Sequence, residues 1–251
     1  MLEHCPDWIE GYRHASGALA AIGADAQAIS FATKASDLAP ENFDFACHAG
    51  CLLLDAGRAE DATPYLNRAV TIEPRNPQVL RALSAASHAL DQPDEALEFA
   101  LQAVALAPRD NSLATHAAEL LLRRKRIDEA ATLLVAAVAR DPTNATLWRM
   151  VSAAESQRDA APAALTAIDR ALGFAPDNDE YHLHRGHLLY RSGDFAAAAE
   201  AVNRAAALDP ASQAAQRARV DLLLATGQLS EATAVGGELL RAFPDDEASP
   251  F

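Results

Sequence analysis

Prolines recur along this chain at one fixed spacing, and that period constrains the fold more than any other feature of the sequence. With each proline numbered as position 32 of a repeat, position 20 is alanine in all seven complete repeats. A period of this length predicts an array of structural repeats, each contacting its neighbours. The prolines stand 34 residues apart, at Pro6, Pro40, Pro74, Pro108, Pro142, Pro176, Pro210 and Pro244.

The register also sets the expected domain boundaries. Residues 1–8 contain Pro6 in register and are expected to be the remnant of a preceding repeat or an N-terminal tail, and residues 247–251 form a C-terminal tail. Too few residues follow Pro244 for a polar capping helix, so we expect the ends to be covered by further chain or by homo-oligomerisation. Seven repeats are predicted over residues 9–246, at 9–42, 43–76, 77–110, 111–144, 145–178, 179–212 and 213–246.

Each repeat has the pattern of two helices joined by a short turn. In the second repeat, Leu52–Leu54 lead to Gly57 and then to a second helical stretch. Gly23, Gly193 and Gly227 occupy the same turn, where a residue without Cβ adopts positive φ. The recurrent proline ends the second helix, and a polar residue beside it can cap the next one. Such a hairpin cannot bury its apolar face alone, so the fold is predicted to be all-α and stabilised by stacking.

The small residues at position 8, the alanines at positions 20 and 27 and the proline at position 32 resemble the tetratricopeptide repeat over essentially the whole chain. The resemblance implies a right-handed solenoid, or α-α superhelix, of antiparallel helix hairpins. Two departures are local: Val220 replaces the small residue in the last repeat, and Pro64 lies within a second helix, which we expect to start late or kink.

The resemblance further implies that the first helices line a concave groove, reached by repeat positions 2, 5, 6, 9, 12 and 13. Position 6 is histidine in every even repeat, and position 5 is arginine in every odd repeat, a spacing of 68 residues. The arginines are either a ladder of bidentate donors for a ligand or the trace of a duplicated two-repeat ancestor, and the sequence leaves both open. The candidate partner-binding residues are Arg13, His14, His48, Arg81, His116, Arg149, His184, His187, Tyr190, Arg191 and Arg217.

Two stretches look like metal sites when taken alone. His184 and His187 share a helix face, but position-6 histidines of successive even repeats lie too far apart to bind one zinc ion together. The thiols of Cys47 and Cys51, at i and i+4, are too far apart for an unstrained disulfide. Together with His48 they could contact a metal ion, but we interpret these three residues as lining the groove. No metal, cofactor or catalytic residue is therefore predicted, and no nucleotide-binding or hydrolase motif occurs.

Composition excludes several classes of partner. The net charge of −14 argues against nucleic acid, because phosphate binding requires a basic face. No apolar run is long enough to span a membrane, and the N-terminus lacks a secretory signal, so a cytoplasmic location is expected. The scarcity of lysine beside common arginine suggests a bacterial source.

These observations favour a non-catalytic scaffold or adaptor that binds a peptide or protein segment, extended or acidic, in the groove. Repeats five to seven present tyrosine, arginine and methionine to the groove, residue types that are enriched at protein interfaces, and we expect most of the binding energy there. The alternative is a substrate-recruiting region of a larger bacterial enzyme, such as a glycosyltransferase or sulfotransferase, with its catalytic domain outside this chain.

Overall fold

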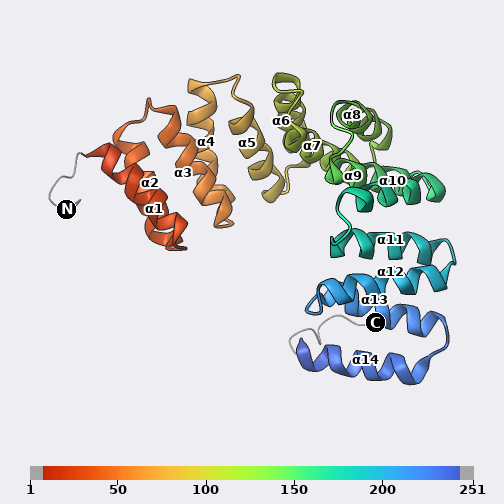
Figure 1. The fold of residues 1–251 in the computed structure, drawn as a ribbon. Helices are drawn as coiled ribbons and strands as arrows, with labels where there is room; N and C mark the ends of the chain where they lie inside the picture. The colour runs from red at the N-terminus through yellow and green to blue at the C-terminus, as the bar shows by residue number, and fades with distance from the viewer. Residues whose placement is uncertain (1–7, 244–251) are drawn as a thin grey trace. The chain divides into compact units, whose positions relative to one another are not determined.

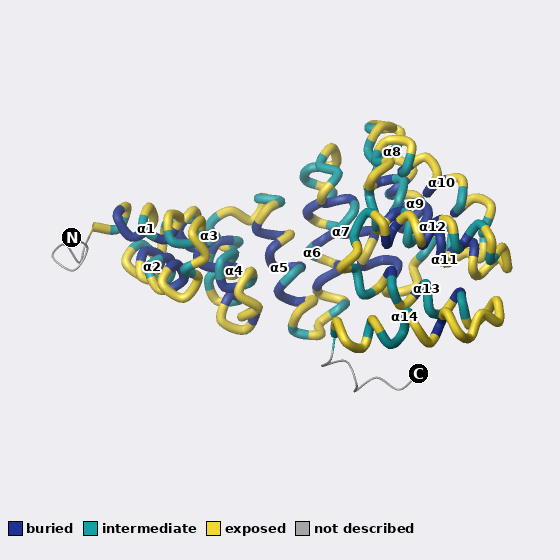
Figure 2. The backbone as a smooth tube through the Cα atoms, turned by 60° about the horizontal axis from the view of Figure 1, so that its bottom comes forward, coloured by how far each residue is buried: buried dark blue, intermediate teal, exposed yellow. Residues whose placement is uncertain are grey.

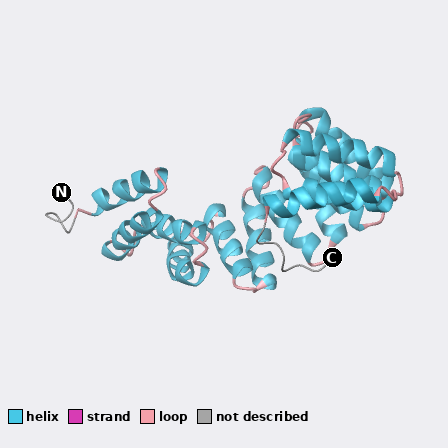
Figure 3. Ribbon diagram, turned by 90° about the horizontal axis from the view of Figure 1, so that it is seen from below, coloured by secondary structure: helices cyan, strands magenta, loops and turns pink. Residues whose placement is uncertain are grey.

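The computed structural model describes residues 8–243, which form fourteen helices and no strand (Figures 1 and 3). The all-α prediction is confirmed. The first helices of the repeats are α1 (Ile9–Ala21), α3 (Phe43–Asp55), α5 (Pro77–Ala89), α7 (Asn111–Arg123), α9 (Ala145–Gln157), α11 (Asp179–Arg191) and α13 (Gln213–Ala225). The second helices are α2 (Asp25–Leu38), α4 (Ala59–Ile72), α6 (Pro93–Leu106), α8 (Ile127–Arg140), α10 (Ala161–Phe174), α12 (Phe195–Leu208) and α14 (Leu229–Ala242).

The chain divides into two compact units, an N-terminal unit of residues 1–121 and a C-terminal unit of residues 122–251. The predicted N-terminal remnant, apart from Trp8, and the predicted C-terminal tail lie outside the described residues.

Polar residues cap most of the first helices, as the sequence predicts. The Asn42 side chain accepts a hydrogen bond from the Phe45 amide at 3.1 Å, and Asn178 accepts one from Tyr181 at 2.9 Å. Each bond satisfies an amide that the first turn of the helix leaves without a partner. The same capping bond is made by Asn76, Asn144 and Ser212.

Pro64 does not delay its helix. Helix α4 begins at Ala59, which is the same repeat position at which the other second helices begin. The expectation of a late start is wrong, because the flanking alanines, Ala62 and Ala69, are fully buried and hold the helix in the common register.

All seven turns between first and second helices contain a residue with positive φ at the same repeat position. Four are the predicted glycines, with φ between 72° and 79°. The other three are Asp91, Lys125 and Asp159, with φ of 57°, 59° and 57°. A side chain in this region crowds the following carbonyl and costs about 1–2 kcal/mol, so these three turns are strained relative to the glycine turns.

Replacing Lys125 by glycine should therefore stabilise the protein. We expect the free energy of unfolding to rise by about 0.5–1 kcal/mol, since relief of the positive-φ strain exceeds the extra freedom that glycine gives the unfolded chain. Urea unfolding of Lys125→Gly measures the change, and Lys125→Ala, which keeps a Cβ, is the matched control. An equal gain in both variants would show that loss of the lysine charge, not the backbone, is responsible.

Small residues at repeat position 8 let the two helices of a repeat approach closely. A Cβ built on Gly50 would lie 2.5 Å from Leu66 Cδ2, and one on Gly186 would lie 2.5 Å from Val202 Cγ2. Leu66 and Val202 are almost completely buried, and Figure 2 shows the buried segments along the helix interfaces. Helix α14 is less buried than these interfaces. Among its described residues Ala232 is the one that is buried, and Leu229 and Leu240 are exposed.

Candidate functional site

The same hydrogen-bond network joins an odd repeat to the following even repeat three times. A buried serine on the first helix of the odd repeat donates its hydroxyl proton to an alanine carbonyl on the second helix of that repeat. A histidine on the first helix of the even repeat contacts the same hydroxyl oxygen through Nε2. The serine-to-carbonyl distances are 2.8 Å for Ser16–Ala28, 2.7 Å for Ser84–Ala96 and 2.8 Å for Ser152–Ala164. The histidine-to-serine distances are 3.0 Å for His48–Ser16, 2.8 Å for His116–Ser84 and 3.0 Å for His184–Ser152.

This network explains why histidine alternates at repeat position 6. The partner serines are fully buried and occupy position 8 of the odd repeats, where the even repeats have Gly50, Ala118 and Gly186. A histidine in an even repeat therefore has a hydroxyl partner in the repeat before it. The pairing has a signal in the sequence, because histidine at position 6 and serine at position 8 both recur with a 68-residue spacing. From the sequence alone, however, we interpret the histidines only as residues that bind a ligand.

All three histidines have a lowered pKa. Partial burial is the main cause in each, because it disfavours the charged imidazolium. The position-5 arginine of the preceding repeat lowers the pKa further: Arg13 acts on His48, Arg81 on His116 and Arg149 on His184. The pKa of His184 falls to about 4, with His187 adding a smaller effect. His184 is therefore neutral at physiological pH.

His184 should make the stability of the protein depend on pH. Between about pH 4 and 6.5 the unfolded chain carries a proton on this residue and the folded chain does not. The free energy of unfolding should therefore fall as the pH is lowered through this window, by about 2–3 kcal/mol from this residue. Comparing urea unfolding of the wild type with His184→Gln at both ends of the window isolates the contribution. An identical slope in the two proteins would contradict the lowered pKa.

The predicted arginines are partly engaged within the protein. Arg13 pairs with Glu10 at 3.4 Å, and Arg149 donates to Met150 Sδ at 3.0 Å. Arg191 donates to Ser156 Oγ at 2.7 Å and to Asp159 at 3.0 Å. Arg81, Arg217 and His14 are exposed on the first helices. The predicted arginines therefore have neighbours of several kinds within the protein.

A cavity of about 410 Å³ lies between α11 and α13 in the C-terminal unit. Three of the predicted residues, His187, Tyr190 and Arg191, line it together. The sequence did not single out the rest of its wall, which comes from small or apolar positions on α11, α12 and α13 and from one carboxylate: Gly186, Val202, Ala218, Leu222 and Asp221. Ala218 occupies repeat position 6 here, so this position faces the cavity.

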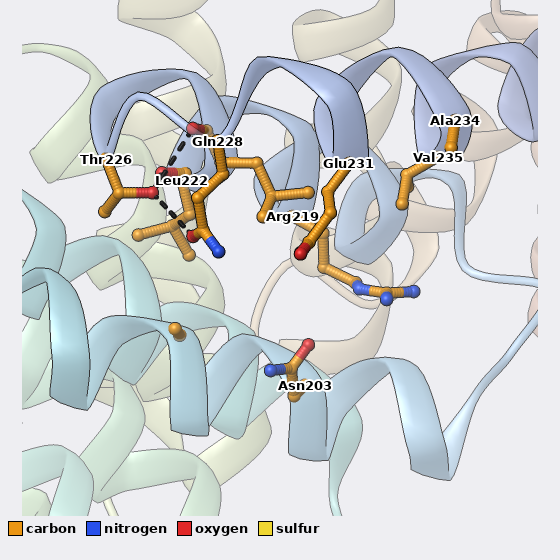
Figure 4. Close-up of a pocket in the computed structure, with 10 residues that line it drawn as sticks. Asn203, Arg219, Leu222, Thr226, Gln228, Glu231, Ala234 and Val235 are labelled. Carbon is orange, nitrogen blue, oxygen red and sulfur yellow. Dashed lines mark hydrogen bonds between the residues drawn. The ribbon is translucent and has the colours of Figure 1, made fainter.

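A second cavity, of about 250 Å³, lies between α12, α13 and α14 (Figure 4). Asn203, Arg219 and Glu231 line it, and the Thr226 hydroxyl beside them is hydrogen-bonded to the Leu222 carbonyl at 2.8 Å. It contains none of the predicted binding residues. We therefore take the α11–α13 cavity as the candidate site.

Cys47 and Cys51 are both partly buried on α3. A hydrogen bond between the two thiols raises the pKa of Cys47 and lowers that of Cys51 to about 7, with Arg81 also favouring the Cys51 thiolate. Among the described residues, no group of three or more His, Cys, Asp or Glu side chains is arranged to hold a metal ion. None of the helices in the described part of the chain is long and apolar enough to cross a membrane.

Two family models of the tetratricopeptide repeat match the sequence. One matches residues 116–179 and 183–247, and the other matches residues 53–120. A search of curated protein sequences gives no match.

Several solved structures share the fold at low sequence identity. A tetratricopeptide repeat protein from Parabacteroides merdae superposes with a TM-score of 0.80 at 13% identity, covering 95% of this chain and 94% of the other. PilF from Pseudomonas aeruginosa gives a TM-score of 0.67 at 20% identity, covering 80% and 92%. YrrB, described as having an unusual peptide-binding site, gives 0.58 at 21% identity, covering 70% and 91%.

Proposed function

Because this chain belongs to the tetratricopeptide repeat family, we propose that it is a protein-interaction scaffold and that it binds an extended peptide segment between α11 and α13. The family supports the scaffold role in general. The peptide and its position are supported by the α11–α13 cavity, which combines an apolar floor with a polar rim. YrrB provides a precedent for peptide binding by a similar fold.

The cavity suits one apolar side chain of a peptide. Val202, Ala218 and Leu222 form a buried apolar floor. At the rim, Tyr190 is 39% exposed and its ring is 5.5 Å from that of Phe195 in an edge-to-face arrangement. A ring held in this way loses little side-chain entropy on binding, which is typical of residues that dominate interfaces.

The rim offers both donors and acceptors to the flanking peptide. His187 and Asp221 lie on neighbouring helices across the cavity, and Arg191 is held beside them by its bonds to Ser156 and Asp159. Because Arg191 is already oriented, it can bind a peptide carbonyl without a large further loss of rotamer freedom.

Peptides selected on the full chain from a random-sequence display library, at neutral pH, test this proposal. Tyr190→Ala should weaken the selected peptide about 5- to 30-fold, as expected for an interface residue of this kind, while Tyr190→Phe should keep most of the affinity. His187→Glu should also weaken binding. Fluorescence anisotropy measures each affinity, and circular dichroism checks that each variant is folded.

The control is Ala207→Glu, which introduces the same charge at an exposed position of α12 away from the cavity. It should leave the affinity unchanged. If no peptide is selected, or if Ala207→Glu weakens binding as much as His187→Glu, the proposed site is wrong.

A further inference from the structure

The α11–α13 cavity contains a carboxylate that is not paired within the described part of the chain. Asp221 lies on α13 next to the floor residue Leu222, and it is exposed. Within residues 8–243 its side chain makes no ion pair or hydrogen bond. An acceptor of this kind beside an apolar floor is available to a ligand that brings a positive charge.

The arginines close to the cavity do not offset this negative charge. Arg191 lines the cavity, but its guanidinium is paired with Asp159 at 3.0 Å, so a carboxylate of the protein already balances its charge. Arg217, one turn before Asp221 on α13, is exposed and is not among the residues that line the cavity. With histidine counted as neutral, the unbalanced formal charge among the lining residues is therefore negative.

Tyr190 is a second feature of the cavity that suits a cation. Its ring is partly exposed, and it lines the same cavity as Asp221 from the neighbouring first helix. A cation over the face of an exposed aromatic ring gains about 0.5–1 kcal/mol. The formal net charge of −14 acts in the same direction, because it attracts basic segments from a distance.

We propose that the segment bound between α11 and α13 carries a lysine or arginine near its apolar anchor residue, and that Asp221 and Tyr190 bind this cation together. The inference rests on the proposed function and specifies the class of ligand. Its sign is opposite to that of the acidic segment expected from the recurrent arginines. The reason is that Arg191 is engaged within the protein, whereas Asp221 makes no such contact in the described chain.

The geometry of an extended peptide sets the spacing between the anchor and the basic residue. Successive side chains point to opposite sides, so residues i and i+2 face the same surface about 7 Å apart. With the anchor on the floor formed by Val202, Ala218 and Leu222, a basic residue two positions away points back to the rim, where Asp221 lies. A basic residue directly next to the anchor would point away from the cavity.

Peptides selected on the full chain from a random-sequence display library test this inference. They should be enriched in lysine or arginine two positions from an apolar residue. Asp221→Asn should weaken a selected basic peptide about 3- to 10-fold, measured by fluorescence anisotropy. Replacing the basic residue of the peptide by methionine should cause a similar loss on the wild type and little further loss on Asp221→Asn, since the two charges act as a pair. Added salt should weaken the wild-type complex more than the variant complex.

Glu200→Gln is the matched control, because it removes the same charge at an exposed position of α12 that lines neither the α11–α13 cavity nor the cavity beside α14. It should leave the affinity unchanged. Selected peptides that lose binding with Tyr190→Ala but have no basic residue, or that bind Asp221→Asn as tightly as Glu200→Gln, would overturn the inference and leave the proposed function intact. If no peptide is selected, or if Tyr190→Ala has no effect, both fail.

Discussion

Gly50→Ala should destabilise the protein by about 2–3 kcal/mol, the cost of forcing an extra carbon into a packed core. The new Cβ would lie 2.5 Å from Cδ2 and 2.7 Å from Cγ of Leu66, and 3.4 Å from its backbone nitrogen. Leu66 is fully buried, so its side chain cannot move out into solvent. Helices α3 and α4 must therefore separate, which also disturbs their neighbours in the N-terminal unit. Urea unfolding monitored by circular dichroism measures the loss.

Gly17→Ala is the matched control for this substitution. Gly17 also lies within a first helix, α1, but a Cβ there would meet no atom within 4 Å. Alanine is the better helix former, so the free energy of unfolding should rise by about 0.5–1 kcal/mol. The two variants should thus change stability in opposite directions. Equal effects would contradict the close packing at position 8.

Ser84→Ala should cost about 1–3 kcal/mol, because it leaves the Nε2–H of His116 without its acceptor in a partly buried position. The hydroxyl also binds the Ala96 carbonyl at 2.7 Å, so its removal weakens contacts to two helices at once. Thermal unfolding of the variant should show a lower midpoint than the wild type.

Two further variants separate the network from the general effect of losing a serine. Ser192→Ala removes a hydroxyl that bonds only within its own turn, to the Leu188 carbonyl at 2.9 Å, and should change stability by less than about 0.5 kcal/mol. In a double-mutant cycle of Ser84→Ala with His116→Leu, the second change should cost less than it does alone, since the unpaired donor is gone. Strictly additive losses would show that the two side chains do not interact.

The period of the sequence was sufficient to predict the helices, because one proline and two alanines per repeat set both the helix ends and the closely packed faces. The glycine turns followed from the same reasoning. The turns at Asp91, Lys125 and Asp159 adopt the same backbone without glycine, since the stacked helices on either side impose the conformation. No local signal marks those three residues as strained.

Less of the candidate site than of the fold can be predicted from the sequence. His187, Tyr190 and Arg191 were predicted together, and they line one cavity. The floor of that cavity comes from Val202 on a second helix and from the next repeat, and residues so far apart in the chain are related only by the packing. The pairing of His184 with Ser152 is of the same kind. Histidine at position 6 and serine at position 8 are both visible when the repeats are aligned. Whether the two side chains contact each other depends on how one repeat packs against the next.

A crystal structure of the chain with a display-selected peptide would show where the peptide binds. We expect an extended peptide between α11 and α13, with one apolar side chain on the floor formed by Val202, Ala218 and Leu222, beside Tyr190. A peptide bound instead in the cavity between α12, α13 and α14, or on the outer face of α14, would contradict it.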